Sequence, residues 1–195
     1  MCICANLPVS SLMYFMIKSV TVFCGYQPKG EKGAMYLAMA KEFGALLAKA
    51  GFVVVSGGNG GMMTETCRGA HEAGGEVHCI TLRREQWPLD HAAFTRDEDF
   101  VNLTPRQQRL LELGDAYVAL PGGIGTHFEI LEVLCKKGVD EIPRDRPFIC
   151  VGEEFIPLKQ LITSIVNDGM SYSDPLSLIT FVPTIEDALA ILKRK

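Results

Sequence analysis

The residues best suited to chemistry lie together at residues 121–129, where the chain reads PGGIGTHFE. Glycines between a strand and a helix let the backbone bring bare N–H groups, and the positive end of the helix dipole, against a phosphate. Glu129 would lie about 4.5 Å further along the helix axis than Thr126, an offset of about one ribose. The segment therefore predicts a phosphate site with a carboxylate that faces the group attached to the phosphate.

A carboxylate in this position suits chemistry at ribose C1′. The ionised form is favoured near a helix N-terminus, so Glu129 would act as a base or stabilise positive charge. Cleavage at C1′ passes through an oxocarbenium-like transition state, which a carboxylate stabilises while it activates water. Arg106, expected on the first turn of the preceding helix, is the second member of the pair, able to hold phosphate or to orient Glu129.

Structural explanations of the same residues stay open. Thr126 and Glu129 have the spacing of a capping box, in which each side chain accepts a hydrogen bond from the other residue's backbone N–H and no function is implied. Arg106 is equally compatible with a solvated surface arginine.

A second glycine cluster, GGNGGMM at residues 57–63, also follows an apolar strand and precedes a helix. It lacks the dinucleotide fingerprint, because Met63 occupies the position that requires Gly or Ala and no acidic residue closes a strand about twenty residues later. Neither cluster contains a Gly-Lys-Ser/Thr motif. NAD is therefore disfavoured, and a P-loop nucleotidase is excluded.

These motifs need a scaffold that brings strand ends together, and the hydrophobic pattern predicts one. Apolar runs predict strands at 19–24, 52–56, 76–81, 116–120, 146–152 and 179–182, with helices between them. One helix is expected to begin with Thr104 as N-cap and Pro105 at its first position, and residues 82–99 are expected to form a long irregular connection. The fold class is α/β, with one Rossmann-like domain, a doubly wound, mostly parallel sheet and helices on both faces.

Composition narrows the classes of function. The chain has 195 residues, 48% apolar and 22% charged, as in compact globular domains. Its net charge of −4 and the absence of a long basic run disfavour a nucleic-acid partner. Seven cysteines without a CxxC pair indicate reduced thiols of a cytoplasmic protein, and no metal site is expected.

Residues 1–15 are apolar, but they lack a basic leader region, a small-residue cleavage site and the length to span a bilayer. We expect no membrane partner. We interpret these residues as a disordered extension or a mis-assigned start, with the domain at 16–195 opening at Met16.

Four segments together resemble the LOG, or Lonely Guy, family, long labelled "possible lysine decarboxylase". They are FCGY at 23–26, GGNGGMM at 57–63, Arg106 nine residues before Asp115, and a complete PGGxGTxxE motif at 121–129. The resemblance covers nearly all of the chain from residue 18 onward. It implies a Rossmann-like homodimer that hydrolyses the N-glycosidic bond of nucleoside 5′-monophosphates, including cytokinin nucleotides, to free base and ribose 5-phosphate.

The resemblance also implies roles for individual residues. Arg106 and Glu129 would be the catalytic pair, and no cofactor is expected. The residues expected to bind substrate or phosphate are Gly25, Tyr26, Gly58, Gly60, Met63, Gly122, Gly123, Gly125 and Thr126. The proton donor to the leaving base is not identified, and His91 and His127 are candidates because histidines titrate near neutrality.

Two departures from the family affect the choice of substrate. Lysine usually follows the arginine, whereas this chain has Gln107, and Tyr26 replaces a small serine. Gln107 removes a positive charge beside the site and favours an alternative, a non-catalytic nucleotide or molybdenum-cofactor carrier on the same scaffold. A pyridoxal-phosphate decarboxylase is the third hypothesis, disfavoured because no lysine lies in or beside either glycine loop.

The helix expected at 126–137 also bears on assembly. Its apolar residues Phe128, Ile130, Leu131, Val133 and Leu134 occupy more than one face, which is more than packing on its own sheet requires. A dimer contact is expected there.

Overall fold

The chain alternates strands and helices through residues 16–84, 93–171 and 174–194, which the computed structural model describes. The strands are β1 (Ser19–Phe23), β2 (Val53–Ser56), β3 (Val77–Leu82), β4 (Arg96–Phe100), β5 (Ala116–Ala119), β6 (Phe148–Val151) and β7 (Thr180–Val182). The helices are α1 (Gly33–Lys49), α2 (Gly61–Glu72), α3 (Leu103–Leu113), α4 (Ile124–Gly138), α5 (Ile156–Asn167) and α6 (Ile185–Leu192), with short 3-10 turns η2 (Glu153–Phe155) and η3 (Pro175–Leu178). The interpretation of residues 1–15 concerns residues outside these ranges.

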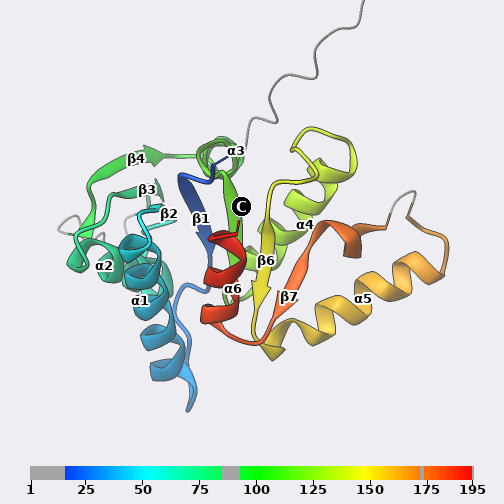
Figure 1. Ribbon diagram of the computed structural model, residues 1–195, viewed down its shortest axis with the longest axis horizontal. Coiled ribbons are helices and arrows are strands. Elements are labelled where there is room, and N and C mark those ends of the chain that lie inside the picture. Colours follow the sequence, from blue (N-terminus) through cyan, green and yellow to red (C-terminus); the bar gives the residue numbers. More distant parts are fainter. Residues whose placement is uncertain (1–15, 85–92, 172–173, 195) are drawn as a thin grey trace, which may run out of the picture.

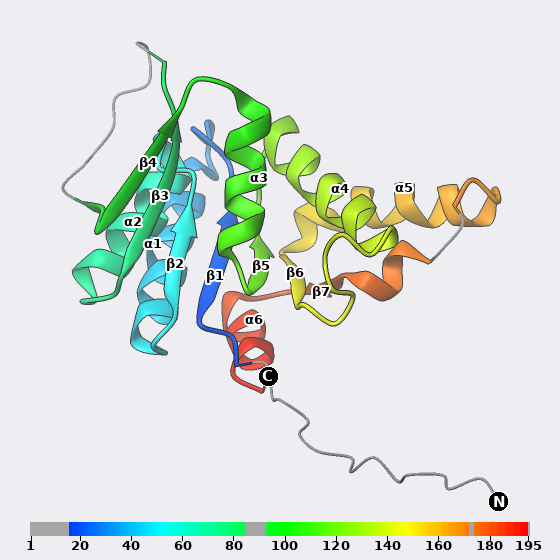
Figure 2. The same ribbon diagram turned by 90° about the horizontal axis from the view of Figure 1, so that it is seen from above.

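All seven strands form one sheet in the order β4-β3-β2-β1-β5-β6-β7, and every neighbouring pair is parallel. The chain builds outward from β1 to β4, returns to the other side of β1 at β5, and then builds outward to β7. β1 and β5 therefore lie side by side at the centre, as Figure 2 shows. The predicted doubly wound α/β fold is confirmed.

Helices cover both faces of the sheet. α1, α2 and α6 bury Phe43, Met62 and Ala188 in a core on one face, and Figure 1 shows α6 in front of the central strands. α3, α4 and α5 bury Leu110 and Ile130, among others, in a second core on the opposite face. Because β5 and β6 are covered on both faces, they read as continuous apolar runs. Within the described ranges, no helix is both long and apolar enough to cross a membrane.

The expectation of an irregular connection at 82–99 is wrong in its last part, where β4 forms. β4 pairs with β3 from His78 opposite Arg96 to Leu82 opposite Phe100. Its sequence, RDEDF, has no apolar face, because it is an edge strand and charged side chains are what such strands carry to avoid pairing with another chain. Residues 85–92 of the same connection lie outside the described ranges.

Two helices begin earlier than the sequence predicts. α3 begins at Leu103 after Asn102, so Thr104 is not its N-cap. α4 begins at Ile124 after Gly123, and no side chain caps it. The capping box expected at Thr126 is therefore wrong, and its two side chains are available for other contacts.

Candidate functional site

Most of the expected site residues line one cavity. It lies at the carboxyl ends of β1 and β5, where the strand order reverses. The segments that follow β1 and β5 touch there, since the Gly25 N–H donates to the Pro121 carbonyl at 3.1 Å. A cavity of about 350 Å³ lies beside this contact. It is lined by Cys24, Gly25, Tyr26, Asn59, Met63, Leu82, Leu103, Arg106, Gln107, Gly123, Ile124, Gly125, Thr126, Phe128 and Glu129. Doubly wound sheets bind their ligands at this crevice, outside the carboxyl ends of the strands.

Glu129 reaches the cavity from the second turn of α4, and only 12% of its side chain is exposed. Burial raises the pKa of its carboxyl group to about 7, while the Arg106 charge and a hydrogen bond from Gln107 act in the opposite direction. This direction is opposite to the expected preference for the ionised form near a helix N-terminus. Desolvation raises the pKa of Glu129 more than the positive end of the helix dipole lowers it. Both protonation states are therefore populated at neutral pH.

Arg106 faces Glu129 from α3, with its Nη1 4.0 Å from Glu129 Oε1. Its Nε donates to the Ile80 carbonyl at 2.8 Å, which fixes the guanidinium against β3. Burial lowers the pKa of Arg106, but an arginine stays charged at neutral pH. The residue is 6% exposed, so the alternative of a solvated surface arginine is wrong.

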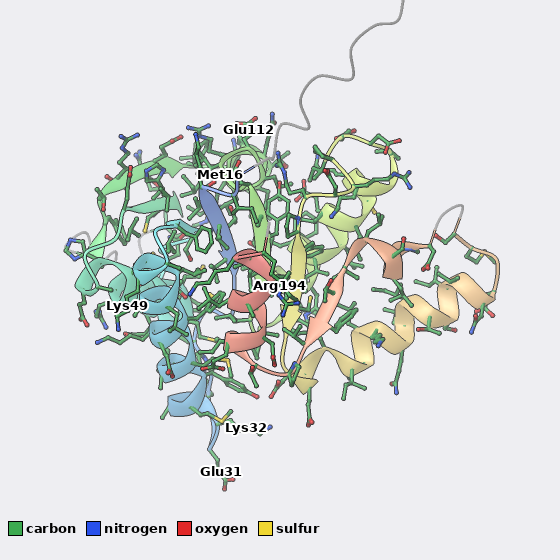
Figure 3. All side chains as sticks on the ribbon, viewed as in Figure 1. Met16, Glu31, Lys32, Lys49, Glu112 and Arg194 are labelled. Atoms are coloured by element: carbon green, nitrogen blue, oxygen red, sulfur yellow. The ribbon has the colours of Figure 1, made fainter. Side chains whose placement is uncertain are left out.

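The pair differs from most charged residues in the described ranges, which are exposed. Figure 3 shows Glu31, Lys32 and Glu112 at the rim of the molecule, where water solvates them. Arg106 and Glu129 instead lie inside it, where desolvation makes each charge costly. Buried, perturbed charges in a cleft are typical of functional sites.

Gly57 provides the space that Arg106 occupies. A Cβ atom at Gly57 would lie 2.2 Å from Arg106 Nη2 and 2.5 Å from Met63 Sδ. Sequence reasoning did not select this glycine. The glycine cluster at 57–63 thus serves the cavity by admitting a guanidinium group.

Gly58 and Gly60 lie outside the cavity wall and shape the loop behind it. Both have positive φ angles, +66° and +105°. The Thr64 hydroxyl donates to the Gly58 carbonyl at 3.2 Å and accepts from the Gly60 N–H at 3.0 Å. The Tyr26 ring packs on Gly60, where a Cβ atom would lie 2.7 Å from Tyr26 Cε2. Gly60 therefore seats Tyr26, which does line the cavity, whereas Gly58 packs toward Cys79 and Thr81.

The first turn of α4 supplies hydrogen-bond donors. The first N–H groups of a helix have no acceptor within it, and among the described residues no backbone carbonyl accepts from the N–H of Ile124, Gly125 or Thr126. Gly122 makes room for the Thr126 hydroxyl, which would lie 2.1 Å from a Cβ atom at that position. These donors border the cavity that holds Glu129.

Two polar residues in the cavity were missed as site residues. Gln107, noted only as a departure from the family, donates through Nε2 to Glu129 Oε1 at 3.3 Å. Asn59 donates to the Leu82 carbonyl at 2.9 Å and accepts from the Leu82 N–H at 2.8 Å, which ties the loop after β2 to the end of β3. The available signal for Asn59 was a single amide side chain among four glycines.

The outer wall of the cavity is apolar, which the sequence did not reveal. Leu103, Ile124 and Phe128 line it although they are 46%, 88% and 47% exposed. Leu82 and Met63 continue the apolar surface inward. This wall suits a flat or apolar group better than a charged one.

The histidines that the structure describes do not line this cavity. His127 Nδ1 lies 2.9 Å from the Gly123 carbonyl, and His127 is not among the cavity-lining residues. His91 lies outside the described ranges. None of the lysines in the described ranges lines the cavity, so it offers no amine for a Schiff base with pyridoxal phosphate.

Comparison with known proteins supports a family assignment. Residues 63–192, more than half of the chain, match the family described as "Possible lysine decarboxylase". A relative from Rhodococcoides fascians, named cytokinin riboside 5′-monophosphate phosphoribohydrolase, is 29% identical over 90% of this chain and 89% of its own. A rice relative named as a probable enzyme of the same kind is 29% identical over 90% of this chain and 72% of its own.

Solved structures share the fold. A molybdenum cofactor binding protein from Rippkaea orientalis superposes with a TM-score of 0.68, over 91% of this chain and 96% of its own, at 20% identity. At this identity, the likeness concerns the fold alone.

Proposed function

Because the chain belongs to the family described as "Possible lysine decarboxylase", we propose that it hydrolyses the N-glycosidic bond of a nucleoside 5′-monophosphate. The products are a free base and ribose 5-phosphate. The observation that carries the proposal is the buried pair Arg106 and Glu129, 4.0 Å apart and beside the free N–H groups of a helix N-terminus.

The phosphate would bind at the first turn of α4. The N–H groups of Ile124, Gly125 and Thr126 and the positive end of the helix dipole favour an anion there. Gly123 and Gly125 are sterically open, since a Cβ atom at either would meet nothing within 4 Å. The absence of side chains gives a phosphate direct access to the backbone.

Glu129 would then face the ribose. As the C1′–N bond breaks, positive charge develops on the ribose, and the carboxylate stabilises it while taking a proton from the attacking water. The hydrogen bond to the Ile80 carbonyl positions the Arg106 guanidinium. Its positive charge lowers the pKa of Glu129, so part of this buried carboxyl group is ionised at neutral pH. The arrangement supplies a base and a fixed cation from side chains of this chain.

The base would lie against the apolar wall. Leu103, Ile124 and Phe128 offer it a surface, and Tyr26 offers an aromatic ring near the loop after β1. A purine with an apolar substituent, as in a cytokinin nucleotide, would cover more of this wall than a pyrimidine. We therefore expect isopentenyl-AMP to rank above CMP and UMP.

We also propose a homodimer in the cytoplasm. Ile124, Phe128 and Leu131 form an exposed apolar stripe on α4, spaced four and three residues apart. The stripe borders the cavity, so a second copy covering it would also narrow the entrance. The cysteines in the described ranges are free thiols, as in a reducing compartment.

A product assay tests the activity. Purified protein is incubated with AMP, GMP, CMP, UMP and isopentenyl-AMP, and free base is followed by chromatography. We expect base release that falls by about 10² to 10⁴ in Glu129→Gln, while AMP still raises the melting temperature of the variant. Glu132→Gln, on the same helix and half-buried, is the matched control. Unchanged release by Glu129→Gln would remove the carboxyl group from the mechanism.

A second candidate is a non-catalytic carrier of a nucleotide or of the molybdenum cofactor. Gln107 favours it, because the family's lysine is absent beside the site. A carrier would retain its ligand through purification, whereas a hydrolase would release both products. Mass spectrometry of the native protein, together with the absence of base release, would favour the carrier.

A further inference from the structure

Gln107 is a buried amide side chain that contacts the Glu129 carboxyl group. It is 4% exposed, lies next to Arg106 on α3, and donates through Nε2 to Glu129 Oε1 at 3.3 Å. Its other polar atom, Oε1, is buried and accepts no hydrogen bond from the described residues. A buried acceptor without a donor is costly, and most such atoms in folded proteins have a partner.

A donor for Gln107 Oε1 is available when the neighbouring Glu129 carboxyl group is protonated. A protonated carboxyl group carries one O–H donor, whereas an ionised one only accepts. Rotation of the terminal amide by half a turn exchanges its Nε2 and Oε1, because the two ends of a carboxamide have nearly the same shape. After this rotation, Oε1 would face the carboxyl group from which it can accept a hydrogen bond.

We propose that Gln107 is a positioning residue that holds the Glu129 carboxyl group in both protonation states. Its amide donates to the carboxylate and, after rotation, accepts from the carboxylic acid. A lysine at this position has three donors and no acceptor, so it would hold the carboxylate alone. The inference rests on the proposed function, to which it adds the path of the proton.

In that reaction, the water oxygen forms a bond to C1′ as the C1′–N bond breaks, and the electron pair of that bond goes to the base. The water proton moves to the Glu129 carboxylate. It then passes from the carboxylic acid to the base nitrogen, which restores the carboxylate. Glu129 serves as base and then as acid, so neither His91 nor His127 is required as a proton donor.

The other titratable groups that act on or lie beside Glu129 are Arg106, Cys24 and Glu132, and burial raises the pKa of Glu132 as well. Arg106 on α3 stays positive. Burial raises the pKa of Cys24, after β1, so its thiol stays neutral. Glu132, on α4, is half-buried, and its charge raises the pKa of Glu129. Titration of Glu129 near neutrality, with its pKa raised by burial to about 7, agrees with a carboxyl group that uses both states.

A titration without substrate tests the hydrogen bonds directly. The protein carries ¹³C-labelled glutamate and ¹⁵N-labelled glutamine. The Glu129 carboxyl signal is assigned by its loss in Glu129→Gln, and the Gln107 amide signals by their loss in Gln107→Met. We expect both sets to shift with one midpoint and the amide protons to stay protected from water on both sides of it. Amide signals that stay still while Glu129 titrates, or lose protection on one side, would overturn the proposal.

Turnover gives the second readout. We expect Gln107→Met to lower kcat for AMP at least tenfold with KM unchanged, and Gln107→Lys to move the acid limb of the pH profile down by one unit or more. Gln108→Met and Gln108→Lys are matched controls, since Gln108 is exposed and bonds Glu112 instead. A pH profile unmoved in Gln107→Lys would overturn the proposal. Absence of turnover in the native chain would contradict the proposed function instead, and the substrate-free titration would still decide the role of Gln107.

Discussion

Glu129 makes the stability of the protein depend on pH, through the energetic cost of its own ionisation. Its ordinary pKa of 4.5 is raised by burial to about 7 in the folded chain. Between these values the folded state binds more protons than the unfolded state, so stability falls as pH rises. The contribution is complete below about pH 4.5 and is lost as pH rises through 7. The ionised carboxylate that the reaction needs is thus the less stable form.

Removing the charge at this position should therefore stabilise the fold. We expect Glu129→Gln to raise the free energy of unfolding at pH 8 by about 2 kcal/mol, and to change it little at pH 4.5. Urea unfolding at the two pH values measures the difference. Glu132→Gln should show a smaller dependence, because that side chain is half-buried. An equal effect of Glu129→Gln at both pH values would contradict the assigned burial cost.

Gly57 offers a way to displace Arg106 without changing any charged residue. In Gly57→Ala the new methyl group would lie 2.2 Å from Arg106 Nη2, so the guanidinium must move. We expect kcat for base release to fall about tenfold or more, since misplacement of a catalytic group by about 1 Å is that costly. Ser56→Ala, at the neighbouring buried position, is the control. Native turnover by Gly57→Ala would show that the position of Arg106 is not critical.

At the scale of secondary structure elements, most of the fold was predictable because helices bury the sheet on both faces. β5 and β6 are covered on both faces and read as unbroken apolar runs, and β2 is apolar up to Ser56, so these strands and the helices between them were predicted in the correct order. β4 was not, because an edge strand has no such run to display. It becomes a strand only through its pairing with β3, and the local sequence RDEDF does not predict that pairing.

The candidate site was predictable to the same limited degree. The glycine turn at 121–126 and the pair Arg106 and Glu129 were found from spacing and resemblance. The start of α4 was not, because Gly123 caps it without a side chain. Gln107 and Asn59 were missed because their roles depend on partners distant in sequence, at Glu129 and Leu82.

β4 is joined to α3, the helix that carries Arg106, by a two-point ion pair. Arg109 Nε and Nη2 lie 2.8 Å from the two carboxylate oxygens of Glu98. The hydrogen bonds from Arg109 lower the pKa of Glu98. The pair therefore adds stability above the ordinary pKa of glutamate, and this is lost as pH falls through the lowered value.

We expect Glu98→Gln to reduce the free energy of unfolding at pH 7 by about 0.5 kcal/mol, because both side chains are more than a third exposed and water screens the pair. The difference should vanish in acid. A double-mutant cycle with Arg109→Met measures the coupling. Zero coupling would mean that the ion pair does not help to hold α3 against β4.

At the scale of the whole molecule, the apolar stripe of Ile124, Phe128 and Leu131 makes a prediction about assembly. We expect the native chain to sediment as a dimer and Leu131→Glu to shift it toward monomer, because a charge at the centre of an apolar contact must be desolvated. Met35→Glu is the control, because Met35 is 47% exposed, compared with 40% for Leu131, but lies on α1. A native chain that sediments as a monomer would contradict the proposed dimer.

The central position of β1 has a consequence for the kinetics of folding. On one side β1 pairs Val20 with Val54, and on the other it pairs Val20 with Ala116, much further along the chain. The pairing of β1 with β5 closes the longer loop, so it costs more entropy and forms later than the pairing of β1 with β2. We therefore expect β1, β2 and β3 to acquire protection first in pulsed hydrogen exchange, and β5 after them. Until β5 docks, α3 and α4 have no complete sheet to pack on, so Arg106 and Glu129 should come together only in the last stage of refolding.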